Sequence, residues 1–194
     1  MRTDFLDATE LAAIGFAAIG EDVRISRHAL FFAPERIRIG ARTRIDAFCI
    51  LSAGAGGIII GRNVHLSAHA TILGGGAVTI GDFCTLSVRC AVFASNDDYS
   101  GATMTNPTVP ARFRGAVDAP VTIGAHAILG ASCVVLPGVT IGESAAVGAL
   151  SLVREDLPPF AVAVGAPARV VGRRREEHRA LAARYLAETE GGEI

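Results

Sequence analysis

Large aromatic side chains are scarce in this 194-residue chain: tryptophan is absent, and Phe, Tyr and Trp together make up 6% of the residues. A core without large rings has to be built from Ile, Val, Leu and Ala. The chain also lacks an excess of charge of either sign. Its net charge of −1 argues against nucleic acid or an anionic membrane as a partner.

Long hydrophobic runs are missing as well. The longest, from Leu11 to Gly20, is short and interrupted by glycine, so the sequence predicts no membrane-spanning segment. The first residues, MRTDFLDATEL, carry acids and lack the basic-then-apolar order of a signal peptide. Four cysteines without an export signal indicate reduced thiols, and we expect a cytoplasmic protein.

What the sequence does contain is a short repeat. Aliphatic residues followed by small ones recur six residues apart, as in IGRNVH and LSAHAT from Ile60. The pair Ile-Gly opens a block at Ile19, Ile39, Ile60, Ile80, Ile123 and Ile141. These blocks start eighteen to twenty-one residues apart, except between Ile80 and Ile123. A period of six does not fit an α-helix, but it fits short strands joined by tight corners.

The fifth residue of each six-residue unit is always small. These positions hold Val23, Ala29, Thr43, Cys49, Val64, Ala70, Cys84, Cys90, Ala127, Cys133, Val139, Ala145 and Ser151. We expect them to point inward near a corner, where little volume is free. Three units make one coil, and stacked coils bury an aliphatic core that no single coil could bury alone. The four cysteines are therefore interpreted as small packing residues rather than as metal ligands or catalytic thiols.

This repeat, an aliphatic residue, then glycine, with a small residue in fifth place, runs from about Ile19 to Val171. It resembles the repeat of the hexapeptide-repeat acyltransferase superfamily. The resemblance implies an all-β fold, a left-handed parallel β-helix solenoid with one long inserted loop and a C-terminal helix. The left hand comes from the family, because parallel crossovers are usually right-handed.

The resemblance also suggests how the chain is divided. We expect an N-terminal cap over residues 1–18, the β-helix acetyltransferase domain over 19–172 with its inserted loop at about 95–120, and a C-terminal helix and tail over 173–194. In the last segment, Leu181 with Tyr185 and Ala182 with Leu186 recur at helical spacing, which predicts a helix with one apolar stripe.

The C-terminal half, from Pro120 to Gly172, looks like that of sugar and xenobiotic acetyltransferases that use acetyl-CoA. The resemblance places the pantetheine arm beside Ala131 and Ala149, where small side chains let a thin chain approach the backbone. Further cofactor positions implied by the resemblance are Arg154, Glu155, Arg169 and Arg173. Arginine binds phosphate through a planar fork of donors. The alternative for the run from Arg173 to Arg175 is the solvated start of a helix.

The repeat stops between about Ser95 and Pro120. Long loops in compact repeats are usually functional, and an ornamental surface insertion is the alternative. In relatives such a loop reaches across a trimer interface and helps to form the acceptor site, so the resemblance implies a homotrimer. Aligned with maltose- and galactoside-type O-acetyltransferases, the chain has Asp97 where they have the catalytic histidine, and the loop contains no histidine at all.

The missing histidine favours an amine acceptor. A sugar hydroxyl, which is about as weak an acid as water, needs a general base that titrates near neutral pH. An amine flanked by electron-withdrawing oxygens titrates nearer to about 8, so it needs positioning more than deprotonation.

We predict that Asp97, Asp98 and Asn96 are catalytic. Free aspartate, with a pKa of about 3.9, is a poor base. Like-charge repulsion between Asp97 and Asp98 and burial against Tyr99 would raise the pKa of one carboxyl group. Alternatively, the two carboxylates hold an ammonium group and accept its proton. Asn96 would orient the acceptor or the thioester carbonyl.

The predicted substrate-binding residues are Ser67, His69, Gly75 and Tyr99. The first three lie where relatives contact the acceptor, and Tyr99 comes from the loop. His28, His69 and His126 are each fourth in a unit, at a corner that normally faces solvent, so an exposed role without function is the alternative for each.

Some amino-sugar N-acetyltransferases of the superfamily also lack the histidine and carry Asn-Asp near this point. The run SNDDYSG followed by TNPTVP looks like sugar acetyltransferases from surface-polysaccharide gene sets. We therefore predict a metal-independent, acetyl-CoA-dependent transfer to the amino group of a nucleotide-linked amino-deoxy sugar. Sugar O-acetylation, a γ-type carbonic anhydrase, which needs three histidines on zinc, and a non-catalytic solenoid stay open.

Overall fold

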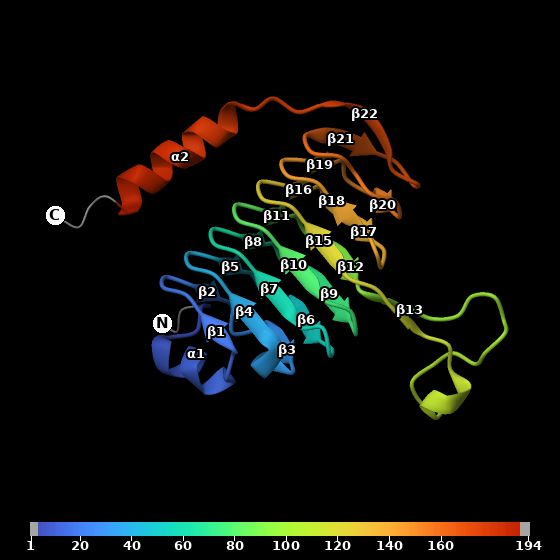
Figure 1. The fold of residues 1–194 in the computed structure, drawn as a ribbon. Coiled ribbons are helices and arrows are strands. Elements are labelled where there is room, and N and C mark those ends of the chain that lie inside the picture. Colours follow the sequence, from blue (N-terminus) through green and yellow to red (C-terminus); the bar gives the residue numbers. More distant parts are fainter. Residues whose placement is uncertain (1–3, 191–194) are drawn as a thin grey trace.

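The structure is a computed structural model that describes residues 4–190. The chain winds as a left-handed parallel β-helix of about seven turns (Figure 1). Three sheets form its walls, all parallel except for the last strand of the second, β22, which runs antiparallel to β21, and one loop leaves the coils between β12 and β15. The predicted β-helix, inserted loop and C-terminal helix are confirmed.

Each coil contributes one short strand to each wall. The first sheet holds β1 (Ala18–Ile19), β4 (Ile37–Ile39), β7 (Ile58–Ile60), β10 (Val78–Ile80), β15 (Val121–Ile123) and β18 (Thr140–Ile141). The second holds β2 (Arg24–Ile25), β5 (Arg44–Ile45), β8 (His65–Leu66), β11 (Thr85–Leu86), β16 (Ile128–Leu129), β19 (Ala146–Val147), β21 (Ala161–Val164) and β22 (Arg169–Arg173). The third holds β3 (Leu30–Phe32), β6 (Ile50–Ala53), β9 (Thr71–Gly74), β12 (Ala91–Phe93), β17 (Val134–Val135) and β20 (Leu152–Val153).

Two of the corners between sheets turn through residues with positive φ. The first corner, between the first and second sheets, consists of Asp22, Arg42, Asn63, Phe83, His126, Ser144 and Phe160. The second corner, between the second and third sheets, has a positive φ at Phe48, His69, Arg89, Ser132 and Leu150, and His28 takes the same place in the first coil without a positive φ. Because the strands are stacked in register, the corner residues of successive coils lie above one another in columns.

The small fifth residues of the repeat line the core as expected. Twelve of the thirteen are buried, and Ala29 is half-buried. All four cysteines are 0% exposed and unpaired. The thiols of Cys49, Cys90 and Cys133 donate to carbonyl oxygens of the following coil, at 3.2, 3.1 and 3.0 Å. Burial raises the pKa of the Cys84 thiol to about 12, so this side chain is a protonated packing group at neutral pH.

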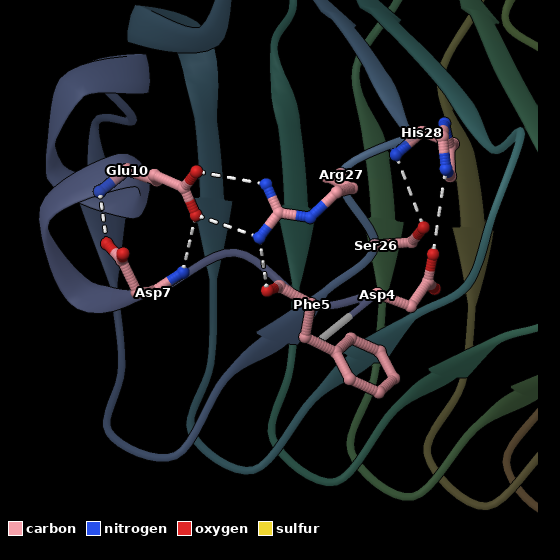
Figure 2. A network of polar contacts seen from close by, with 7 residues as sticks. All are labelled: Asp4, Phe5, Asp7, Glu10, Ser26, Arg27 and His28. Carbon is pink, nitrogen blue, oxygen red and sulfur yellow. Dashed lines mark hydrogen bonds and ion pairs between the residues drawn. The ribbon is translucent and has the colours of Figure 1, made fainter. Parts of the chain in front are cut away.

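The N-terminal cap is tied to the first coil by Arg27 (Figure 2). Helix α1 (Ala8–Ile14) begins with a capping box in which Asp7 and Glu10 satisfy each other's backbone amides. The Arg27 guanidinium donates to both oxygens of Glu10, at 2.9 and 3.2 Å, and to the carbonyl oxygen of Phe5 at 2.9 Å. The hydrogen bond with Glu10 raises the pKa of Arg27, so this clamp stays charged.

The C-terminal helix α2 (Glu177–Glu190) runs back along the first corner (Figure 1). Asn63 Nδ2 donates to the Tyr185 hydroxyl at 3.0 Å, and His178 Nε2 lies 2.8 Å from the hydroxyl oxygen of Ser144. Ala182 and Leu186 are half-buried on the side facing the coils. Neither helix within residues 4–190 has the length and hydropathy that crossing a bilayer requires.

Candidate active site

The second corner gathers two of the predicted substrate-binding residues. Ser67 follows β8 directly, and its amide donates to the Leu86 carbonyl of the next coil at 2.9 Å. His69 is the corner residue of the same coil, with a φ of 63°. Its exposed imidazole stacks on Phe48, with ring centroids 5.0 Å apart. Ser67 and His69 therefore share one edge of the third sheet.

Two further histidines, His65 and His126, have different neighbours. His65 points outward from β8, and its Nε2 lies 2.8 Å from Asp46 Oδ2. His126 on the first corner lies beneath α2, where burial and the nearby His178 lower its pKa. His65 and His69 thus have separate neighbours, Asp46 and Phe48. Within the described part of the chain, no three His, Cys, Asp or Glu side chains are grouped so as to hold a metal ion.

The inserted loop is carried by a short antiparallel ribbon. Strand β13 (Ser95–Asn96) pairs with β14 (Val117–Asp118), and the one-turn helix η2 (Ala111–Phe113) lies within the loop. A second such helix, η1 (Pro34–Arg36), lies near the N-terminal end. Figure 1 shows the ribbon and loop projecting away from the coils. Asp97 is the first residue beyond β13, and its side chain is exposed.

Asp98 is fully engaged within the loop. One carboxylate oxygen accepts hydrogen bonds from the amide and hydroxyl of Ser100, at 2.8 and 2.6 Å. The other accepts from the amide and hydroxyl of Thr103, at 2.8 and 2.9 Å. The bonds from Ser100 and then those from Thr103 hold the pKa of Asp98 well below its usual range. The predicted repulsion from Asp97 therefore does not raise the pKa of Asp98, and this side chain fixes the shape of the loop.

The predicted burial against Tyr99 is wrong. The side chain of Tyr99 is 87% exposed, because the loop stands away from the coils and no other element within residues 4–190 covers it. Asp97, Asp98, Tyr99 and Thr105 instead line an open hollow of about 170 Å³. The carboxylate of Asp97 thus faces solvent in a single chain.

Gly75 lies at the base of the ribbon. Its amide donates to the Ser95 hydroxyl at 2.9 Å, and a Cβ atom at this position would lie 2.2 Å from a carboxylate oxygen of Asp118. Glycine is needed here because Asp118 occupies the space of a side chain. In the structure, Gly75 supports the ribbon that presents Asn96 and Asp97.

Replacing Gly75 by alanine is expected to shift the ribbon and lower kcat/KM roughly 10- to 100-fold, because a misplacement of about 1 Å can cost 10²-fold in rate. Steady-state kinetics would measure the loss, and circular dichroism would check the fold. Gly172→Ala is the matched control, since nothing lies within 4 Å of a Cβ atom there. Equal activity of the two variants would show that the ribbon is not a positioning element.

The predicted cofactor residues fall into two places. Ala131 and Ala149 are exposed beside the second corner, and the amide of Leu150 donates to the Ala131 carbonyl at 2.9 Å. Near them in sequence, Glu155 lies 3.4 Å from Arg154 and 3.5 Å from Arg169. These three exposed side chains form a charged cluster with a net positive charge.

Arg173 does not join this cluster. It lies at the far end of β22 from Arg169, roughly 13 Å away at about 3.3 Å per residue. Its guanidinium lies 4.7 Å from the ring centroid of Phe160 and 2.7 Å from a carboxylate oxygen of Glu176. The structure thus separates Arg173 from the other predicted phosphate-binding residues and places it beside α2.

A single chain does not bring all the predicted site residues together. Ser67 and His69 precede β9 at one edge of the third sheet, whereas Asn96 and Asp97 follow β12 at the opposite edge. At about 3.3 Å per residue, the intervening strand separates the two groups by more than a hydrogen-bond distance. Within one chain, the two groups therefore lie at opposite ends of the strands of this wall.

Comparison with known proteins shows that the chain is similar to acyltransferases. No protein-family model matches the chain. Over 173 residues it is 43% identical to the dTDP-4-amino-4,6-dideoxy-D-glucose acyltransferase of Escherichia coli, with 89% of this chain and 90% of that protein covered. The structure is similar to AntD, an N-acyltransferase from Bacillus cereus, in complex with dTDP-4-amino-4,6-dideoxyglucose and coenzyme A. The TM-score is 0.92 at 35% identity, with 97% of this chain and 100% of that chain covered.

More distant structures share the fold alone. The hexapeptide-repeat acetyltransferase VCA0836 from Vibrio cholerae superimposes with a TM-score of 0.60 at 22% identity, over 88% of this chain and 83% of that chain.

The AntD structures also point to a residue that the sequence analysis missed. They include variants of one serine and of one aspartate that lies ten residues further along that chain. Ser87 and Asp97 are ten residues apart here. Ser87 has the same place in its coil as Ser67 in the preceding one. The sequence could have indicated Ser87, because it lies in the last repeat unit before the inserted loop and is closer to that loop than Ser67 is.

Proposed function

The chain belongs to the hexapeptide-repeat acyltransferase superfamily, and we propose that it acylates the amino group of a dTDP-linked 4-amino-4,6-dideoxy sugar, with acetyl-CoA as donor. The proposal rests on the inserted loop of a chain that is similar to amino-sugar acyltransferases over nearly its whole length. This loop contains Asp97 and no histidine. Such a loop suits an amine, which is already a nucleophile once neutral.

The reaction forms one C–N bond and breaks one C–S bond. The lone pair of the neutral amine attacks the thioester carbonyl carbon, and the resulting oxyanion collapses to release coenzyme A. The proton lost by the nitrogen ends on the departing thiolate, so that coenzyme A leaves as a thiol. Asp97 accepts a hydrogen bond from the amine and passes on this proton, Asn96 orients the acceptor, and Asp98 holds the loop in shape.

We assign the active species as a homotrimer in which the loop of one chain meets the second corner of the next. The outward face of the third sheet supports this assignment because it is largely apolar. Its outward residues include Leu30, Phe32, Ile50, Leu73, Ala91, Phe93, Val134 and Leu152. Facing another copy would bury these side chains and complete the divided site.

The acyl donor fits the C-terminal part of the second corner. Ala131 and Ala149 leave room for the pantetheine arm, and Arg169 with Arg154 offers guanidinium groups for the phosphates of coenzyme A. We treat residues 19–172 as the acyltransferase domain and place its product in surface polysaccharide synthesis. The four unpaired cysteines suit a cytoplasmic reaction.

A donor screen tests the proposed function. The protein would be incubated with dTDP-4-amino-4,6-dideoxyglucose and, separately, acetyl-CoA and 3-hydroxybutyryl-CoA, while release of free thiol is followed. We expect acceptor-dependent thiol release with acetyl-CoA. Release with neither donor would contradict acyl transfer to this sugar, and release only with the longer donor would contradict acetyl as the group transferred.

A further inference from the structure

The N-terminal half of the second corner carries a ladder of exposed rings. His28 stacks on Phe48 with centroids 5.6 Å apart, and Phe48 stacks on His69 at 5.0 Å. Phe48 is nevertheless 52% exposed, in a chain with few aromatic residues. Exposed aromatic rings of this kind provide faces and edges on which a nucleobase can pack.

Arg89 follows these rings in the same column, one coil after His69. Its side chain is exposed and makes no hydrogen bond or ion pair with any residue in the described range. Most of the arginines within residues 4–190 are paired with an acid or packed on a ring. An unpaired guanidinium is a strong ligand for a phosphate group because it can donate two parallel hydrogen bonds.

The position of Ser87 indicates in which direction a bound nucleotide would extend along the corner. Ser87 is two residues before Arg89 on the same corner, and its spacing from Asp97 matches that of the two residues varied in AntD. A nucleotide attached to a sugar at Ser87 has two ways to extend along the corner, whose coils are about 4.8 Å apart. Toward the C-terminus the corner offers Ser132 and Leu150, neither of which is aromatic or cationic.

We propose that His28, Phe48, His69 and Arg89 form the nucleoside diphosphate site of the acceptor, with Arg89 on the diphosphate and the rings against the pyrimidine base. This placement rests on the proposed function, and it puts the two substrates end to end on one corner, with the acyl donor toward Ala131 and Ala149. The amino group of the sugar then lies between them, in the coil of Ser87.

Titration calorimetry with dTDP and, separately, with coenzyme A tests this site in the full-length protein. Phe48→Ala is expected to weaken dTDP binding about 10-fold, since stacking of a base on an aromatic ring is worth about 1–3 kcal/mol. Arg89→Ala is expected to weaken it roughly 10- to 100-fold, the loss of charge-assisted hydrogen bonds. Affinity for coenzyme A should not change in either variant.

Two matched controls sharpen the test. Phe48→Tyr keeps the ring and should keep the affinity for dTDP. Arg38→Ala removes an exposed guanidinium on the outward face of the first sheet and should have no effect on dTDP affinity.

Unchanged dTDP affinity in Phe48→Ala and Arg89→Ala would overturn the site even when the wild type acylates the amino sugar. An equal loss of affinity for coenzyme A would assign the corner to the donor instead. A wild type that neither binds dTDP nor acylates the sugar would overturn the proposed function as well.

Discussion

Asp97→Asn is expected to lower kcat about 100-fold, within the 10²- to 10⁴-fold range of general acid–base catalysis, and to leave the affinity for acetyl-CoA unchanged. Asparagine has nearly the same shape as aspartate but neither charge nor basicity. It can still occupy the hollow beside Thr105, but it cannot hold an ammonium group or take up its proton. Steady-state kinetics with the amino sugar, together with calorimetry of acetyl-CoA binding, would measure both quantities.

Asp22→Asn provides the matched control for this substitution. Asp22 is an exposed carboxylate on the first corner, far along the chain from the loop, and its loss should leave kcat unchanged. If Asp97→Asn and Asp22→Asn are equally active, Asp97 has no part in the reaction. If Asp97→Asn instead weakens acetyl-CoA binding, its carboxylate acts on the donor rather than on the amine.

The second large effect is expected from Leu73→Arg. Leu73 lies on the outward face of the third sheet, in register with Ser52 and Phe93. In a trimer that buries this face, the guanidinium would lose its hydration without gaining a partner, at a cost of several kcal/mol. We expect the variant to be a folded monomer and to lose at least about 100-fold in activity, because one chain separates Ser87 from Asp97 and positioning alone is worth factors of this size.

Thr79→Arg is the control for the second prediction. Thr79 lies on the outward face of the first sheet, in register with Thr122, where polar side chains are common, so this variant should remain trimeric and active. Sedimentation velocity and circular dichroism would report assembly and fold. An active trimer of Leu73→Arg would place the interface on another face. An active monomer would show that the site is complete in one chain.

The β-helix could be predicted from the sequence because its packing is strictly local and repeated. Each coil places a small residue at the same corner of the core, because little volume is free there. Small side chains therefore recur in the sequence at positions such as Cys49, Ala70 and Cys90. The cap at the N-terminal end depends instead on a specific contact between side chains. The clamp between Arg27 and Glu10 joins two residues whose contact no periodicity predicts.

The candidate site was less accessible to sequence reasoning. Asp97 and Asp98 are adjacent and chemically identical in sequence, but the turn at Ser100 and Thr103 engages only Asp98. One of the two carboxyl groups was expected to be buried against Tyr99, yet Asp97 and Tyr99 are both exposed because the loop projects from the coils. Arg169 and Arg173 are close in sequence, whereas an extended strand keeps them apart. In each case the backbone conformation decides which groups a side chain contacts. The repeat pattern does not predict that conformation, because these residues lie outside the regular repeats.

The central claim is that the enzyme transfers an acetyl group to nitrogen and not to oxygen. The most direct measurement compares dTDP-4-amino-4,6-dideoxyglucose with dTDP-6-deoxyglucose, which carries a hydroxyl group in place of the amine, under identical conditions with acetyl-CoA. Mass spectrometry would detect the addition of one acetyl group to each acceptor. We predict complete conversion of the amino sugar and none of its hydroxyl counterpart. Acetylation of the hydroxyl sugar, with or without that of the amino sugar, would contradict the account.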